Sequence, residues 1–385
     1  MYNSKKAEKK RVLVIKISSL DRCESSVKRT MAFIKGLVQL DYYVTIVCLE
    51  GASEIYDGTS FEFMKHVDII YINKKSTYGY VIEEVHRNDL IRKMRKIYQL
   101  LKIYDYTKSM AEHIKVSCLK HTRYDYIISI SDPKSSHLAA RKLIAQGVTY
   151  KKWIQYWGDP FATDITNKSV YPMWIYKKIE SKLLEKADRV VYTSPITLRM
   201  QQKIYRKYGT KMYYCPTGYI SELITNNSDN KIRIGYYGAY YSSIRNIVPL
   251  YEACLSLKDF ATLSIVGDSD LKLDSKENIS CRPRGNVEEE EKNTDIFVCI
   301  LNRKGTQIPG KIYYYAASNK PILVILDGCY KSKIKEIFSQ YDRFYFAENN
   351  QDDIKKKVIS IIEENREFSP CKDFAADNVA RIVLG

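Results

Sequence analysis

The chain has few glycines and prolines, and it has no long hydrophobic run. Its 385 residues include 16 Gly and 10 Pro, which excludes collagen-like and low-complexity chains. No stretch approaches the roughly 18 apolar residues of a membrane-spanning helix. The apolar run after the basic N-terminus is interrupted by Lys16 and is too short for a secretory signal. We therefore expect a globular cytoplasmic protein, long enough for two domains.

Cysteine motifs are also missing. The nine cysteines are odd in number and scattered, with no C-x-x-C pair and no histidine at zinc-ligand spacing. This pattern is typical of buried thiols in a reducing compartment and argues against disulfides or zinc sites.

Positive charge is abundant, and it is unevenly placed. The chain has 62 Lys+Arg against 45 Asp+Glu, a net charge of +17. Residues 1–215 hold 39 basic and 21 acidic side chains, so the remaining residues are almost neutral. The first half is therefore expected to meet an anionic partner, which leaves nucleic acid, an acidic membrane surface and a phosphorylated ligand open.

Short β-rich runs alternate with helical patterns throughout, which indicates parallel sheets covered by helices. The breaking residues 216–218 are followed by a polar run, and after it the pattern begins again. We predict an α/β protein with two doubly wound Rossmann-like parallel-sheet domains facing each other across a cleft. The domains are expected at 1–218 and 219–366, with a C-terminal helix in 367–385 that returns to the first domain.

The second half holds an ordered series of motifs. The strand 232–237 ends at Gly238, and Arg245 is expected to open the next helix. A second strand ends at Gly267, and Lys311 lies in a helix that leads directly into the strand 321–326. Glycines let the backbone approach a ligand, and a cation at a helix start suits a phosphate.

This order resembles the nucleotide-sugar-dependent glycosyltransferases of the GT-B type, especially the retaining family that builds bacterial capsule, lipopolysaccharide and exopolysaccharide. The resemblance runs from residue 232 to 326 and extends to the first half. There Val12 begins a V-L-V-I-K strand, and 187–194 reads A-D-R-V-V-Y-T-S.

The resemblance implies roles for individual residues. Gly238 and Gly267 would lie at the donor diphosphate, Arg245 and Lys311 would bind it, and no metal would be needed. The family usually carries two glutamates where this chain has Thr306 and Tyr314. Tyr314 is then expected to stack on the donor or hydrogen-bond to it.

The family also often has a second basic residue where this chain has Ala239. The Asp-Ser-Asp run at 268–270 is interpreted as a loop rather than a metal site.

In the first half, Asp159 follows the strand 153–156 within the distinctive run W-I-Q-Y-W-G-D-P-F. Asp159 is expected to orient the donor sugar or the acceptor hydroxyl, or to act as a base if the reaction inverts configuration. The alternative is an Asp-Pro turn without a catalytic role. Asp21 and Arg22 follow the first strand and are expected to contact the acceptor.

Two proline-marked helix starts are predicted as well. Asp132 and Ser194 each precede a proline and are expected to cap the helix that follows. His137, near the start of the first of these helices, is expected to be bonded locally or to face solvent.

The segment Asp89–Lys108 mixes six basic residues with aliphatic and aromatic ones. It is interpreted as a membrane-surface helix, with a solvated helix face as the alternative. The family resemblance implies a glycan or polyprenyl-linked acceptor. Together with the basic first half, it leads us to expect peripheral contact with the anionic inner face of the cell membrane.

Rival functions are less consistent with the sequence. No nucleic-acid-binding motif is present, so a nucleic-acid partner is not expected. The first strand lacks the G-x-G-x-x-G of a dinucleotide-dependent oxidoreductase. A GT-B-like sugar-nucleotide epimerase shares the architecture and is kept as an alternative, as is a non-enzymatic basic nucleic-acid-binding protein.

Overall fold

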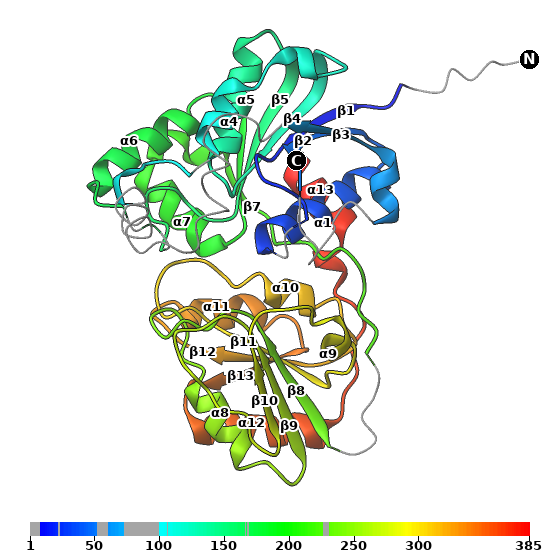
Figure 1. The fold of residues 1–385 in the computed structure, drawn as a ribbon, viewed down its shortest axis with the longest axis vertical. Helices are drawn as coiled ribbons and strands as arrows, with labels where there is room; N and C mark the ends of the chain where they lie inside the picture. The colour runs from blue at the N-terminus through cyan, green and yellow to red at the C-terminus, as the bar shows by residue number, and fades with distance from the viewer. Residues whose placement is uncertain are drawn as a thin grey trace, which may run out of the picture. The chain divides into compact units, whose positions relative to one another are not determined.

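The computed structural model describes residues 8–21, 24–51, 61–72, 100–105, 107–165, 167, 169–225 and 231–385. The chain forms two compact units (Figure 1). Unit 1 contains Met1–Pro216 and Ala376–Gly385, and unit 2 contains Thr217–Ala375. Each unit is described by itself.

Unit 1 is built on a parallel sheet. Its described strands lie in the order β3-β2-β1-β4-β5-β6-β7. They are β1 (Arg11–Ile15), β2 (Tyr43–Leu49), β3 (Val67–Ile72), β4 (Arg123–Ile130), β5 (Thr149–Trp157), β6 (Arg189–Tyr192) and β7 (Met212–Tyr214). The α-helices are α1 (Ser25–Gln39), α4 (Lys108–His113), α5 (Ser135–Ala145), α6 (Met173–Leu184), α7 (Pro195–Ile204) and α13 (Ala376–Leu384). Short 3₁₀ segments are η2 (Glu62–His66), η3 (Val116–Cys118), η4 (Arg206–Lys211) and η5 (Lys372–Phe374), the last of which belongs to unit 2.

The central strands of unit 1 are apolar because helices cover both faces of the sheet. Residues 12–15 of β1 are all fully buried, and such continuous apolar runs are typical of parallel sheets. Most of the basic segment Asp89–Lys108 lies outside the described residues, and α4 begins at its last residue.

The two predicted helix caps have different outcomes. Ser194 caps α7, because its side chain accepts a hydrogen bond from the backbone N–H of Thr197. The prediction for Asp132 is wrong, since α5 begins at Ser135 with Lys134 at the N-cap position. The Asp132 carboxylate forms an ion pair with Lys134 instead. The Ser131–Asp132 and Asp132–Pro133 peptide bonds are both cis.

Unit 2 is a second parallel sheet with helices, and its described strands lie in the order β10-β9-β8-β11-β12-β13. They are β8 (Ile232–Tyr237), β9 (Ala261–Val266), β10 (Ile279–Arg282), β11 (Ile296–Ile300), β12 (Ile322–Leu326) and β13 (Phe344–Glu348). The helices are α8 (Val248–Leu255), α9 (Glu288–Lys292), α10 (Lys311–Tyr315), α11 (Lys331–Phe338) and α12 (Gln351–Glu364). The predicted fold class, two doubly wound parallel-sheet domains, is confirmed.

The C-terminal helix α13 belongs to unit 1, where it packs against α1 (Figure 1). Lys152 Nζ donates to the carbonyl oxygen of Leu384 at 2.9 Å. Arg189 Nη2 donates to the carbonyl oxygen of Ile382 at 3.0 Å. These cations satisfy carbonyl groups at the end of α13, where the helix dipole is negative.

Candidate active site

Each sheet has a point where its strand order reverses. In unit 1 this point lies between β1 and β4, and in unit 2 between β8 and β11. In open α/β sheets, ligands bind beyond the carboxyl ends of the strands at such a point. The residues that follow these four strands are therefore the first candidates for a site.

In unit 2, Gly238 and Gly267 follow neighbouring strands and pack closely. Gly238 N donates to Val266 O at 2.9 Å. A Cβ on Gly267 would overlap the carbonyl group of Gly238, with the carbonyl carbon at 2.5 Å. A Cβ on Gly238 would meet only the Lys311 stem and the Tyr236 hydroxyl, all at 3.7 Å or more. Gly267 thus serves packing, whereas Gly238 presents open backbone.

Lys311, the first residue of α10, lies along Gly238. Its Nζ is 3.6 Å from Glu291 Oε1 and lies over the rings of Tyr237 and Tyr315, at 5.9 and 5.3 Å from their centroids. Tyr314, three residues along the same short helix, is partly exposed. Residues three apart share a helix face, so Lys311 and Tyr314 lie on one side of α10.

Arg245 is folded against the turn that follows β8. Its Nη1 donates to Ala239 O at 2.8 Å, and its Nε donates to Asn302 Oδ1 at 3.0 Å. Because α8 begins at Val248, Arg245 lies before the helix and does not open it as expected. The side chain instead bridges the loops that follow β8 and β11.

Gln307 is a polar residue that the sequence analysis missed. Its side chain is 9% exposed, and neither Oε1 nor Nε2 has a hydrogen-bond partner within the described chain. Asn302 Nδ2 donates to the Gln307 backbone oxygen at 3.3 Å, which links Gln307 to Arg245. Buried amides are normally hydrogen-bonded, so this arrangement fits a polar ligand beside the Gly238 turn.

In unit 1, Asp159 follows β5 and is partly exposed. Burial raises the pKa of Asp159 to about 7, and the carboxylates of Asp132 and Asp164 add to this rise. A carboxyl group with a pKa near neutrality can give or take a proton at physiological pH.

Lys134 lies between two of these carboxylates. It forms an ion pair with Asp132 and another, 2.7 Å long, with Asp164 Oδ2. Burial alone would lower the pKa of Lys134, but the carboxylates, first that of Asp132, raise it. Burial alone would raise the pKa of Asp132, but the charges of Lys134, Arg29 and Lys16 together outweigh it and lower this pKa, so the carboxylate stays ionised.

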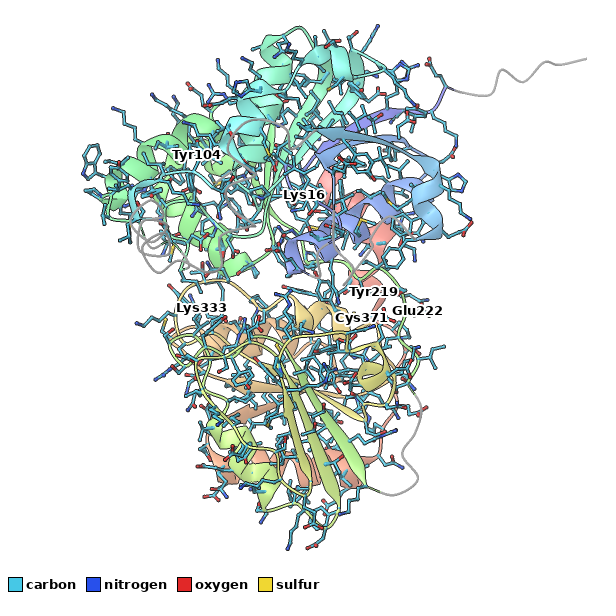
Figure 2. The ribbon with its side chains drawn as sticks, viewed as in Figure 1. Lys16, Tyr104, Tyr219, Glu222, Lys333 and Cys371 are labelled. Atoms are coloured by element: carbon cyan, nitrogen blue, oxygen red, sulfur yellow. The ribbon has the colours of Figure 1, made fainter. Side chains whose placement is uncertain are left out.

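Two further buried cations reach the loop after β4. Lys16, which follows β1, donates to Asp132 O, and Arg29 of α1 donates to Ser131 O. Lys16 lies inside unit 1 (Figure 2) and is fully buried. Burial, with a contribution from Arg29, lowers the pKa of Lys16 to about 7. The Arg29 guanidinium lies 5.6 Å from the centre of the Tyr156 ring.

The loop that carries Asp159 is fixed by Glu180 of α6, which is fully buried. Its carboxylate accepts from the backbone N–H groups of Phe161 and Ala162, both at 2.9 Å, and from the Tyr205 hydroxyl at 2.7 Å. Glu180 therefore acts as a positioning residue for the segment between Asp159 and Asp164.

Of the two residues expected to contact the acceptor, the structure describes one, Asp21. Asp21 is 8% exposed, and its carboxylate lies against Gly51, where a Cβ would overlap it. Arg22 lies outside the described residues.

His137 is fully buried. Its Nδ1 forms a hydrogen bond with Ser129 Oγ at 2.8 Å, and its ring stacks on Trp157. Burial lowers the pKa of His137 to about 3, so it stays neutral.

The described residues contain no group of three or more His, Cys, Asp or Glu side chains arranged to hold a metal ion. In unit 1, the positive charge that pairs with the carboxylates of Asp132 and Asp164 is that of Lys134. In unit 2, cations and open backbone could stabilise an anionic ligand. Unit 2 thus offers groups that could bind an anion, and unit 1 offers a titratable carboxyl group.

Comparison with known proteins gives matches in structure only: no family model and no curated protein matches the sequence. A glycosyltransferase from Rickettsia africae is 15% identical, with a TM-score of 0.53 over 100% of this chain and 94% of that one. The catalytic domain of Arabidopsis thaliana starch synthase IV, bound to ADP and acarbose, is 8% identical, with a TM-score of 0.61 over 97% and 95%. A UDP-N-acetylglucosamine 2-epimerase is 9% identical, with a TM-score of 0.53 over 98% and 94%.

The chain has the GT-B fold. Identities this low establish the architecture and leave the reaction to be argued from the side chains. In this GT-B chain the donor-site candidates Gly238, Arg245 and Lys311 all belong to unit 2. Asp159 and the charged groups around it belong to unit 1.

Proposed function

We propose that this GT-B protein transfers a sugar from a nucleotide diphosphate-sugar to a hydroxyl group of a glycan or lipid-linked saccharide. The observation that carries the proposal is the group of residues at the reversal point of unit 2. There the Lys311 side chain lies next to the open backbone of Gly238, and Arg245 bridges the loops after β8 and β11. In the second of these loops, the amide of Gln307 has no hydrogen-bond partner within the described chain.

These residues match the chemistry of the reaction. Cleavage of the bond between sugar and nucleotide leaves a diphosphate, whose growing negative charge must be stabilised. Lys311 and Arg245 supply positive charge without a metal ion. Asp159, with a pKa near 7, positions the reacting sugar or the acceptor hydroxyl.

We expect retention of anomeric configuration, as in the family that the sequence resembles, and an acceptor from bacterial surface polysaccharide assembly at the inner face of the cell membrane. The configuration of the product, read by NMR, tests the first point. An inverted product would make Asp159 the general base.

The donor can be identified by thermal shift with a panel of UDP-, GDP- and ADP-sugars. A true donor stabilises the folded chain by about 2.7 kcal/mol at a hundredfold excess over its Kd. Gly238→Ala should melt like the wild type, because the added Cβ has room, yet lose this protection because the Cβ occupies the diphosphate position. Lys311→Ala should weaken binding about tenfold or more, since it removes a charged hydrogen bond.

Lys333, exposed on α11 and labelled in Figure 2, is the matched control: Lys333→Ala should bind as the wild type does. If no nucleotide protects the wild type, or if Gly238→Ala and Lys311→Ala both bind normally, the donor site is not here.

An epimerase of sugar nucleotides is the second candidate, because a UDP-N-acetylglucosamine 2-epimerase shares the fold. It predicts conversion of a UDP-sugar in the absence of any acceptor. Incubation of the protein with the stabilising donor alone, followed by NMR, separates the two. Transfer needs the acceptor, whereas epimerisation does not.

A further inference from the structure

Exposed apolar side chains gather at one place in unit 1. Five of the large hydrophobic residues that the structure shows as exposed lie within two short segments, 100–101 and 170–174. Their exposed fractions are 37% for Leu100, 54% for Leu101, 61% for Val170, 53% for Met173 and 64% for Trp174. These five residues form what we call the apolar patch.

The two segments are adjacent in space. The backbone N–H of Val170 donates to Leu100 O at 3.0 Å, and Ser169 Oγ donates to the same oxygen at 3.1 Å. Met173 and Trp174 follow directly as the first residues of α6. The patch is therefore continuous from the 100–101 segment to the start of this helix.

The apolar patch is separate from the apolar face with which α6 packs on unit 1. That inner face consists of Tyr176, Leu183 and Leu184, which are all buried. A helix needs only one apolar face to pack on its own domain. Trp174 and Met173 are thus not required for folding, and their exposure indicates that they contact another molecule or a membrane.

Lysines continue the surface from the patch along α6. Lys178 and Lys182 follow Trp174 at intervals of four residues, so the three share one exposed stripe of the helix. Neither lysine forms an ion pair with any residue that the structure describes. Their charges lie in the half of the sequence that has 39 basic and 21 acidic residues.

We propose that the apolar patch, with Lys178 and Lys182, is a membrane-docking surface that inserts Trp174 and its aliphatic neighbours into the interface of an anionic bilayer. Tryptophan beside aliphatic side chains and lysines is the composition that such interfaces favour. The lysines complement anionic headgroups. No helix among the described residues is long and apolar enough to cross a bilayer.

This proposal deepens the membrane part of the proposed function and does not depend on sugar transfer. Its test therefore uses no substrate. If docking fails while nucleotide binding persists, only this surface is refuted. If nucleotide binding fails while docking persists, only the donor site is refuted.

The fluorescence of Trp174 can report docking. Of its three tryptophans, Trp153 and Trp157 are fully buried and Trp174 is 64% exposed. Vesicles that contain phosphatidylglycerol should shift the Trp174 emission to shorter wavelength and protect it from acrylamide. Phosphatidylcholine vesicles should do neither. The Trp174→Phe variant should lack the shift but still sediment with the anionic vesicles.

Sedimentation with anionic vesicles measures how much each side chain contributes to membrane binding. Trp174→Ala combined with Met173→Ala should lower partitioning at least tenfold, since most of the apolar anchor is lost. Lys178→Gln and Lys182→Gln should each lower it about fivefold at low salt and less at high salt. Phe260→Ala, at a 47% exposed site in unit 2, is the matched apolar control and should change nothing.

Three results would overturn the proposal. The first is no sedimentation with anionic vesicles at low salt. The second is sedimentation without a change in Trp174 emission, since another surface would then bind. The third is self-association that Trp174→Ala abolishes in the absence of lipid, which would make the patch a protein interface.

Discussion

Substitution of Gly158 tests the packing that holds Asp159 in place. A Cβ at this position would overlap the Arg29 guanidinium, with Nη2 at 2.5 Å and Cζ at 2.7 Å. The guanidinium is the end of a flexible side chain, so it is the group that must move. Gly158→Ala therefore acts by detaching Arg29 from its partners.

The expected cost follows from those partners. Arg29 donates to Ser131 O, and a hydrogen bond from a charged group contributes about 1.5–3 kcal/mol. Its guanidinium also lies over the Tyr156 ring, which adds about 0.5–1 kcal/mol. Alanine recovers about 0.4–1 kcal/mol by restricting the unfolded chain. Gly158→Ala should therefore destabilise unit 1 by about 2–3 kcal/mol.

Urea unfolding followed by tryptophan fluorescence measures this cost, because all three tryptophans lie in unit 1. Gly209→Ala is the control: the nearest atom to its new Cβ is 3.9 Å away, so stability should stay within about 1 kcal/mol. In a double-mutant cycle, Gly158→Ala should add almost nothing to Arg29→Ala. An unchanged stability of Gly158→Ala, or additive costs in the cycle, would refute the steric argument.

Two further changes probe the same loop. Between about pH 4 and 7 the folded chain keeps a proton on Asp159 that the unfolded chain releases. The stability of wild-type unit 1 should therefore fall as the pH rises through this window. Asp159→Asn removes the titrating group and should flatten this pH dependence. Urea unfolding across pH checks this, and parallel profiles for the two proteins would contradict the raised pKa of Asp159. Glu180→Ala strands three buried donors and should cost about 2–4 kcal/mol, whereas Glu185→Ala, at an exposed site one turn beyond, should cost almost nothing. A loss below about 1 kcal/mol for Glu180→Ala would show that its hydrogen bonds do not hold the loop.

Most of the architecture could be predicted because buried parallel strands leave continuous apolar runs in the sequence. The expected strand 232–237 matches β8 residue for residue, and the expected strands 153–156 and 321–326 coincide with β5 and β12 to within a few residues. β10 was missed because its four residues, Ile-Ser-Cys-Arg, include only two apolar ones. A short edge strand of this kind is defined by its pairing with β9, which leaves no local pattern.

The candidate donor-site residues could be chosen from the sequence, because glycines and cations at strand ends are visible there. The structure places the Lys311 side chain next to Gly238. It does not place Arg245 at a helix start. Gln307 carries no sequence signal, since its burial and its lack of partners arise only when the loops after β8 and β11 are folded together.

The charged group of unit 1 was largely hidden for a similar reason. Lys134 belongs to the loop after β4, but Lys16 and Arg29 come from distant segments and reach this loop only in the folded unit. Asp132 before a proline has the pattern of a helix cap, but in the structure its carboxylate pairs with Lys134, two residues along the chain. Lys16 did leave a signal, since a lysine within a buried apolar run needs a specific partner.

The assignment of α13 to unit 1 has a consequence for synthesis on the ribosome. Residues 376–385 complete unit 1, yet they are translated after the whole of unit 2. Domains fold as units while the chain emerges, so unit 2 has all of its residues available before unit 1 does. Unit 2 can therefore complete its folding before unit 1, because α1 lacks its partner helix α13 until translation reaches residues 376–385. Deletion of residues 376–385 would then destabilise unit 1, although these residues follow unit 2 in the sequence.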